Sequence, residues 1–367
     1  MDHNQVQEAG MVNIISDLYR KRIKRSYLWL VILLLITAAI TIYSICVTQY
    51  HIAFGRALEI LINNIKGIEP IDYWDRLETS IVCDSLVPRA IGAVIVGAVL
   101  GISGTVMQSI VRNPIADPYT TGISSGALLG VTVSVVLGID LLPIMDSSIS
   151  LMGTAFLFAL IPCFIVMIMS ARHKVTSTMM VLIGVAVMYM FNAISTLLRY
   201  TSTDEKIAEI FNWTVGVLGR VHWESLPVLL AALVLLILFS YFQHRMLNIL
   251  SADDRLCVSL GINPQRMRLI SMAVVAVATA IAVCYVGTIG FVGLVAPHIA
   301  RMFVGSNHAI LLPASAVIGA FILIAADCIA RVATPTGLPV GVITSLVGGP
   351  IFLYILVRQK KSAWGRK

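Results

Sequence analysis

The sequence predicts an all-α protein that crosses the membrane many times, with about ten transmembrane helices. Of its 367 residues, 58% are hydrophobic and only 12% are charged, whereas soluble domains average roughly 45–50% apolar and 25% charged residues. Apolar runs recur along nearly the whole chain, and each is close to the roughly 20 residues that a helix needs to cross the hydrocarbon layer. These observations exclude a water-soluble fold and leave no room for a separate soluble catalytic domain.

Polar residues, prolines and glycines divide the apolar sequence into ten predicted spans. They cover residues 27–48, 87–107, 121–137, 149–170, 177–198, 226–243, 269–286, 291–304, 310–331 and 338–357. The eighth run is short, contains Pro297 and is flanked by glycines, so we expect a partial or tilted helix buried against other helices. Residues 1–26 are then an N-terminal tail, residues 27–357 the transmembrane domain and residues 358–367 a C-terminal tail.

Lysine and arginine indicate how the spans are oriented. If the N-terminus lies in the cytoplasm, most of the 26 Lys and Arg residues fall in the tails and the cytoplasmic loops, as the positive-inside rule requires. We therefore expect a multi-pass protein of the cell membrane with both termini in the cytoplasm. The rule also explains the net charge of +7. Because no basic stretch alternates with aromatic residues in a soluble region, we expect no nucleic-acid partner.

Two longer segments are expected on the outer side of the membrane. Residues 49–85 carry many acidic side chains, and residues 201–224 are predicted to contain a short surface helix. Neither segment is predicted to be a folded domain.

Small residues are dense in the second and third spans. Gly97 and Gly101, and likewise Gly126 and Gly130, have the GxxxG spacing that lets helix backbones approach closely. We predict close helix packing at these four glycines, and the spacing by itself indicates no function.

The turn between these two spans reads RNPIADPY over residues 112–119. Its two prolines end helices, so a plain turn accounts for them. Its clustered polar groups at the cytoplasmic face also fit a gate, and both interpretations stay open from the residues alone.

A nucleotide-binding phosphate loop is not indicated in the sequence. The glycine-rich segment 287–293 is followed by no lysine, and the dipeptide Gly-Lys does not occur, so there is no Walker A motif. If ATP drives transport, the ATPase is another subunit.

Ionisable residues inside predicted spans are functional candidates by default. Asp327 and Arg331 stand one helical turn apart, so mutual neutralisation is favoured over proton coupling. His298 has no Cys, Asp or Glu at ligand spacing, and a structural role is favoured over a metal or haem ligand. The six cysteines form no CxxC pair and are interpreted as packing residues. No metal site is predicted.

The longest cytoplasmic loop reads LNILSADDRLCVSLGINPQRMR over residues 247–268. It is charged, partly apolar and held between two spans, which suits docking to a cytoplasmic partner. An ordinary solvated loop is the alternative.

Three long motifs carry a family resemblance. They are LVPRAIGAVIVGAVLGISGTVMQSIVRNPIADPYTTGISSGALLG, GTIGFVGLVAPHIARMFVGSNHAILLPASAVIGAFILIAADCIARV and LPVGVITSLVGGPIFLYIL. From about residue 86 to the C-terminus, the chain resembles the permease subunits of type II ABC importers, which take up iron–siderophores, haem and vitamin B12. The resemblance implies the type II ABC importer permease fold, in which a ten-helix protomer forms a homodimer around one central pathway.

The same resemblance implies partners. Two ABC ATPase subunits would bind on the cytoplasmic side and a substrate-binding protein on the extracytoplasmic side. No cofactor is expected in this chain, because ATP and Mg would bind to the partner ATPase.

Site residues carry over from the family by motif. The cytoplasmic gate maps to Asn113, Ile115, Thr176 and Ser177. The ATPase-coupling loop, about residues 245–268, contains the candidate residues Asp253, Asp254, Arg255, Leu260 and Gly261. The family's Leu-Gly-Glu triplet is replaced by Ser-Ala-Asp at residues 251–253, so an acidic residue is retained there or at the next position.

Arginines that meet glutamates of the binding protein map to Arg89 and Arg331. The family's Arg-Leu-Pro-Arg reads Leu-Val-Pro-Arg over residues 86–89, so its first arginine is missing. Arg220 is therefore a further docking candidate.

The predicted function is inward translocation of an iron chelate, a siderophore or haem, by alternating access driven by a separate ATPase. A corrinoid such as vitamin B12 is the alternative cargo, with molybdate or tungstate as a further one. A secondary transporter that works alone is less favoured. A membrane-embedded enzyme is the weakest hypothesis, because the chain has neither an HExxH motif nor paired intramembrane carboxylates.

Overall fold

The computed structural model describes residues 3–48, 52–141, 147–173 and 176–364, and in these ranges the regular structure is helical. The helices are α1 (His3–Ser44), α2 (Phe54–Ile65), α3 (Tyr73–Thr79), α4 (Val87–Val111), α5 (Ile123–Leu137), α6 (Ser147–His173), α7 (Ser177–Tyr200), α8 (Asp204–Thr214), α9 (Leu226–Ala252), α10 (Asp254–Ser259), α11 (Pro264–Val286), α12 (Val292–Val304), α13 (His308–Val332) and α14 (Val340–Trp364). A π-helical segment, Ser80–Leu86, joins α3 to α4, and short 3₁₀ turns lie at Pro118–Thr121, Leu218–Arg220 and Trp223–Ser225.

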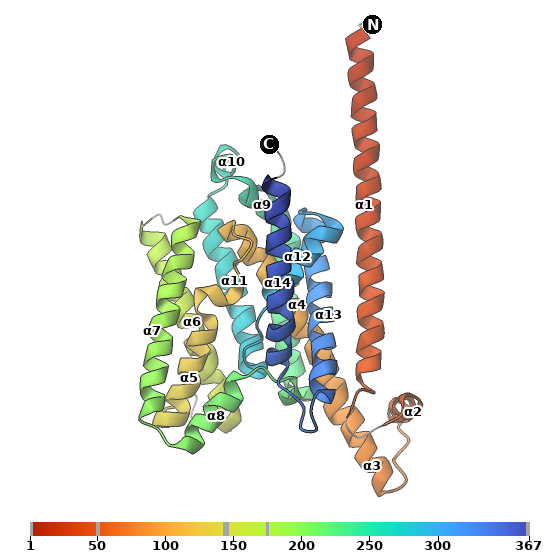
Figure 1. Ribbon diagram of the computed structural model, residues 1–367, viewed down its shortest axis with the longest axis vertical. Coiled ribbons are helices and arrows are strands. Elements are labelled where there is room, and N and C mark those ends of the chain that lie inside the picture. The colour runs from red at the N-terminus through yellow and green to blue at the C-terminus, as the bar shows by residue number, and fades with distance from the viewer. Residues whose placement is uncertain (1–2, 49–51, 142–146, 174–175, 365–367) are drawn as a thin grey trace.

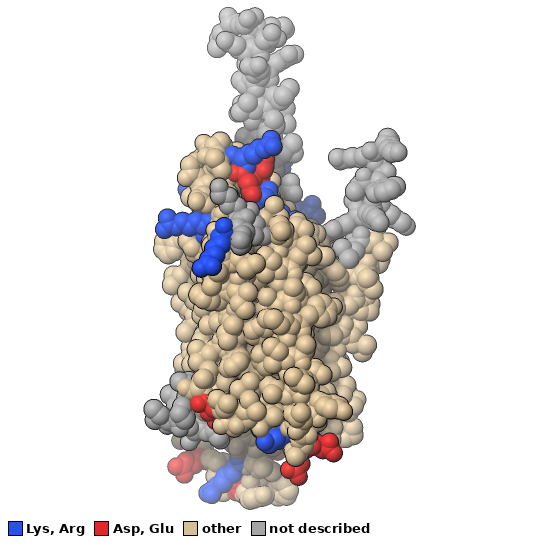
Figure 2. Space-filling model, turned by 90° about the vertical axis from the view of Figure 1, so that its left-hand side faces the viewer, with Lys and Arg blue, Asp and Glu red and all other residues tan. Residues whose placement is uncertain are grey.

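Ten apolar helical stretches in the described residues coincide with the ten predicted spans. Seven are long and apolar enough to cross a membrane, and α5, α12 and the apolar part of α14 are shorter. On the face that Figure 2 shows, charged residues gather toward the two ends and leave a broad uncharged band between them. The predicted all-α, multi-pass fold is confirmed, and α12 is the expected short eighth helix with Pro297 inside it.

Several helices extend further than the apolar runs. The helix α1 begins within the predicted N-terminal tail, α9 continues nine residues beyond residue 243, and α14 continues into the predicted C-terminal tail. No proline interrupts these extensions, and they contain good helix formers such as Gln, Lys and Arg. Hydrophobicity therefore marks where a helix crosses the membrane and does not mark where the helix ends.

The segment 49–85, which was predicted to lie outside the membrane, is more ordered than expected over its described residues. The helix α2, the π-helical segment and Ile52 form a small apolar cluster of Ile52, Ala57, Ile60, Val82, Cys83 and Leu86. Arg56 of α2 forms ion pairs with Glu59, Asp75 and Glu78. The hydrogen bonds to Glu78 and Glu59 raise the pKa of Arg56 above its usual value. These contacts tie α2 to α3.

The centre of the bundle is α4 (Figure 1). Nearly all of its residues are buried, because α9, α11, α12 and α13 pack around it. In contrast, α1 and α7 leave most of their apolar side chains exposed in the single chain.

Glycines set the distance between the central helices. A Cβ atom added at Gly97 or Gly101 would lie 2.4 or 2.1 Å from a carbonyl oxygen of α13. A Cβ atom at Gly126 or Gly130 of α5 would lie 2.4 or 2.9 Å from a carbonyl oxygen of α6. Any side chain at these four positions would push the paired helices apart.

We expect Gly101→Ala to lower the free energy of unfolding by about 1–3 kcal/mol, because the added methyl group overpacks the contact between α4 and α13. Thermal unfolding of the detergent-solubilised protein measures the effect. Gly55→Ala is the matched control, since a Cβ atom at Gly55 in α2 meets nothing within 4 Å and alanine favours a helix. Equal stability of the Gly101→Ala variant and the wild type would contradict the close packing.

Candidate functional site

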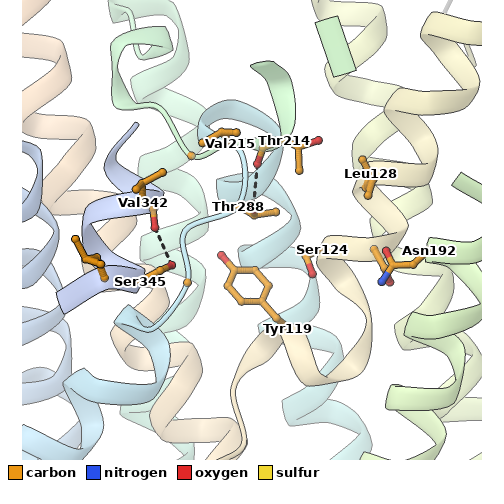
Figure 3. Close-up of a pocket in the computed structure, with 14 residues that line it drawn as sticks. Tyr119, Ser124, Leu128, Asn192, Thr214, Val215, Thr288, Val342 and Ser345 are labelled. Carbon is orange, nitrogen blue, oxygen red and sulfur yellow. Dashed lines mark hydrogen bonds between the residues drawn. The ribbon is translucent and has the colours of Figure 1, made fainter. Parts of the chain in front are cut away.

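A pocket of about 770 Å³ lies between α5, α7 and α14. Its lining combines hydroxyl and amide groups with aliphatic side chains and contains no charged residue: Tyr119, Ser124, Ser125, Leu128, Asn192, Thr214, Val215, Gly216, Thr288, Gly290, Gly341, Val342, Ser345 and Leu346. In Figure 3 the ring of Tyr119 projects into the space between Ser345 and Ser124. The pocket is therefore large, polar in part and electrically neutral.

Extended backbone forms one wall of this pocket. The segment that follows α8 runs parallel to the segment that follows α11, with Val217 N donating to Val286 O at 2.8 Å and Thr288 N donating to Thr214 O at 3.2 Å. Gly287 permits this course at a φ of +75°, which glycine adopts without steric cost. Non-helical backbone at membrane depth is tolerated where it is buried in protein or lines a cavity. The paired segments that follow α8 and α11 thus line a partly polar cavity between the helices.

Three hydroxyl groups that line the pocket form hydrogen bonds with backbone groups. Thr288 Oγ1 donates to Thr214 O at 2.8 Å, and Ser345 Oγ donates to Gly341 O at 2.8 Å. Tyr119 Oη accepts a backbone N–H at 3.4 Å. Such groups can offer weak hydrogen bonds to a passing molecule, but they provide no acid–base pair and no strong metal ligand.

Sequence reasoning did not single out the residues that line this pocket. Tyr119 stands at the end of the RNPIADPY turn, and Thr288 stands in the glycine-rich segment 287–293. Most of the other lining residues, Ser345 among them, fall within the three long family motifs, which indicate the family but not a pocket. Asn192 lies in an apolar span outside those motifs and carries no signal of its own.

Of the four predicted gate residues, two line a pocket beside Arg112 and two lie in the turn that follows Arg112. Thr176 and Ser177 line a pocket of about 440 Å³ next to Arg112, and Thr176 Oγ1 accepts an N–H of the first turn of α7 at 3.4 Å. Asn113 and Ile115 follow Arg112 in the chain but do not line this pocket. Asn113 Oδ1 accepts from Ile115 N at 3.1 Å, and this bond shapes the turn.

Ion pairs that were not predicted tie α10 to the end of α4. Arg112 ends α4 with a φ of +51°, and its Nη2 atom lies 2.8 Å from Asp254 Oδ1 and its Nη1 atom 3.7 Å from Asp253 Oδ1. Arg268 of α11 lies 2.6 Å from Asp254 Oδ1 and donates through Nε to Ile110 O at 2.8 Å. The two predicted acidic coupling residues therefore connect α10, α4 and α11.

The remaining part of α10 presents an apolar surface. Leu256, Val258 and Leu260 expose 44%, 65% and 57% of their surface, and Arg255 is exposed beside them. Gly261 ends the element with a φ of +73°, a conformation that favours glycine. Exposed apolar side chains on a charged end of the molecule fit a protein-docking surface.

At the opposite end of the bundle, Asp327 is fully buried between two arginines. Its predicted ion pair with Arg331 is present at 2.8 Å, and Arg89 Nη2 lies 2.7 Å from its other oxygen. Both arginines line a pocket of about 410 Å³, but the side chain of Arg331 is only 6% exposed and that of Arg89 18%. Arg220 lies outside this pocket and donates to carbonyl oxygens at the end of α8.

His298 is buried in α12 and meets the ring of Phe352 edge-on, with ring centroids 5.8 Å apart. Within the described part of the chain, no three His, Cys, Asp or Glu side chains gather as a metal site would require. The surroundings of His298 are thus those of a packed aromatic side chain.

The FecCD transport family matches the sequence over residues 33–358. The chain belongs to this family. Among its relatives, the hemin transport system permease protein of Yersinia pestis is 37% identical over 76% of this chain and 83% of its own length. The vitamin B12 import system permease protein of Vibrio cholerae is 33% identical over 80% of this chain and 88% of its own length.

A solved structure has the same architecture. It is described as an inward-facing conformation of a metal-chelate type ABC transporter, and it matches with a TM-score of 0.74 and 29% sequence identity over 90% of this chain and 98% of its own. The resemblance to type II importer permeases is confirmed. The FecCD chain described here is a multi-pass permease of an ABC importer.

Proposed function

We propose that the chain translocates an intact iron chelate, such as a ferric siderophore or haem, through the pocket between α5, α7 and α14. The uncharged lining of that pocket carries the proposal. Small oxyanions such as molybdate are held by cationic side chains or clustered N–H groups, and bare metal ions by Cys, His, Asp or Glu. A chelate needs neither, because its metal is already coordinated. A corrinoid satisfies the same condition and is the second candidate.

One chain supplies only part of the wall of the proposed pathway. Leu346 lines the pocket and yet exposes 70% of its surface, and α7, which carries Asn192, is largely exposed. A second copy of the chain would cover these surfaces and enclose the pathway. The proposed assembly is therefore a homodimer.

The two ends of the molecule suit different partners. The N-terminal part of α1, the C-terminal part of α14 and α10 lie at one end (Figure 1), which we place in the cytoplasm with both termini. Two ABC ATPase subunits would dock on α10 and bind the ATP and Mg, so this chain itself needs no cofactor and is not an enzyme. A binding protein would dock at the other end, near Arg89, Arg331 and Arg220, and Asn113, Ile115, Thr176 and Ser177 would close the cytoplasmic side.

Uptake by cells tests this function. Cells that lack the chain are compared with cells that express it, using radiolabelled ferric siderophore, haem, cobalamin and molybdate. We expect uptake of an iron chelate to depend on the chain. Ser124→Trp should lower that uptake strongly because the indole projects into the pocket and narrows the pathway, whereas Val234→Trp on the exposed side of α9 should not.

Several results would contradict the proposal. If only the uptake of cobalamin or molybdate depended on the chain, the cargo would be a different one. If the Ser124→Trp variant showed full uptake, the pathway would lie elsewhere. Transport by liposomes that contain only this chain and an ion gradient would show a secondary transporter.

A further inference from the structure

We propose that a pocket between α1 and the end of α12 binds the phosphate headgroup of an anionic phospholipid. The pocket has a volume of about 380 Å³ and lies at the end of the membrane domain where α12 turns into α13, beside α1 (Figure 1). Its lining is Arg25, Ser26, Trp29, Arg301, Met302, Phe303, Val304 and Gly305. This inference concerns a surface away from α5, α7 and α14 and is independent of the cargo.

The charge of this pocket is positive and uncompensated. Arg25 and Arg301 come from different helices, no acidic residue lines the pocket, and in the described part of the chain neither arginine has an acidic side chain within 4.0 Å. Arg301 Nη1 donates to the neutral amide oxygen of Gln108 at 2.6 Å, which orients the guanidinium without neutralising it. Arg20, Lys21 and Lys24 are exposed on the adjoining turns of α1.

Compensation of the helix dipole accounts for only part of this charge. Arg301 lies in the last turn of α12, where the backbone carries about half a negative elementary charge. Two guanidinium groups exceed that partial charge several-fold. The carbonyl of Val304, which ends α12, already accepts a hydrogen bond from Ser26 Oγ at 3.4 Å. The excess positive charge is therefore available to an anion.

Apolar groups beside the arginines favour a lipid as the source of that anion. Trp29 and Phe303 stack with ring centroids 5.1 Å apart, and aromatic residues of this kind concentrate where the hydrocarbon layer meets the headgroups. Met302 and Phe303 expose 65% and 38% of their surface. The span of α1 is only 11% buried, so acyl chains can lie along it while the phosphate reaches the arginines. Basic pockets between transmembrane helices bind anionic headgroups in this way.

Native mass spectrometry of the full-length protein in detergent tests the proposal, with phosphatidylglycerol, phosphatidylcholine of the same acyl chains and inorganic phosphate as probes. We expect phosphatidylglycerol to bind more tightly than phosphatidylcholine, and Arg25→Gln to weaken its binding about five-fold, the effect of one arginine at an anionic surface. Arg301→Gln should do the same while keeping a donor for Gln108. The control Lys21→Gln removes an equal charge from the same helix outside the pocket and should change binding less than two-fold.

Three outcomes would overturn the inference. Equal binding of the two lipids would show that the headgroup charge is not recognised. Equal losses for Lys21→Gln and Arg25→Gln would show a diffuse surface charge instead of a site. Displacement of phosphatidylglycerol by millimolar inorganic phosphate would show that the pocket takes a free anion. Arg25 is exposed, so its variant is expected to fold and the comparison stays decisive.

Discussion

Replacing Arg112 with glycine is expected to lower substrate uptake about ten-fold or more while ATP hydrolysis by the assembled transporter stays within about two-fold, the scale of a lost coupling free energy. Arg112 joins the start of α10 to the turn that carries Asn113 and Ile115, through its ion pairs with Asp253 and Asp254. A movement of α10 against the ATPase would reach that turn through this guanidinium. Without the Arg112 side chain, ATP hydrolysis continues, but the turn no longer moves together with α10.

Glycine is the informative replacement because Arg112 has a positive φ, which glycine tolerates and alanine does not. The ion pairs are partly exposed, so their loss should change the stability by less than about 1 kcal/mol. Uptake and ATPase activity are measured in proteoliposomes that contain the permease, its ATPase and its binding protein. Arg172→Gln removes an exposed charge from the end of α6 and serves as the control.

A parallel fall of uptake and hydrolysis in Arg112→Gly would assign the ion pairs to assembly of the complex. Unchanged uptake would remove Arg112 from the coupling route. Loss of uptake with hydrolysis retained is the result that supports it.

The Asp327→Asn variant is expected to lose about 3–5 kcal/mol of unfolding free energy, the cost of breaking a buried ion pair from one side. Asp327 is fully buried and is the acidic partner of both Arg89 and Arg331. Asparagine keeps the shape of the side chain but removes the negative charge that the two arginines share. Thermal or denaturant unfolding of the detergent-solubilised protein measures the loss.

A second substitution separates charge from shape. Arg89→Gln added to Asp327→Asn removes one of the two cations that share this carboxylate, and Arg331 keeps its bonds to Ser44 O and Val47 O at 2.8 and 3.0 Å. The double variant should therefore be more stable than Asp327→Asn alone. A single variant as stable as the wild type but unable to transport would favour the proton-coupling alternative over ion pairing.

The sequence predicted best those features that depend on residues close together in the chain. Ten apolar runs predict ten helical spans because each run must satisfy its backbone hydrogen bonds within one helix in lipid. The short, proline-containing run around Pro297 predicts the short α12 for the same reason. The spacing of Asp327 and Arg331 predicts their ion pair, since residues four apart lie on one face of a helix.

Contacts between segments that are distant in the chain could not be predicted from the sequence. Arg89 reaches Asp327 across 238 residues of sequence, and Arg112 meets Asp254 only because α10 folds back over the end of α4. The proposed pathway depends on two extended segments, after α8 and α11, that pair side by side. Nothing in the hydropathy of either segment specifies that pairing.

By itself, the sequence determined the membrane location, the number of spans and, through its long motifs, the permease family. Only the tertiary structure decided which polar residues share a pocket, which arginines share a carboxylate and which ion pairs hold α10. The reason is that transfer into lipid depends on the composition of one segment, whereas a neutral cavity or a buried ion pair depends on how several helices are placed relative to one another.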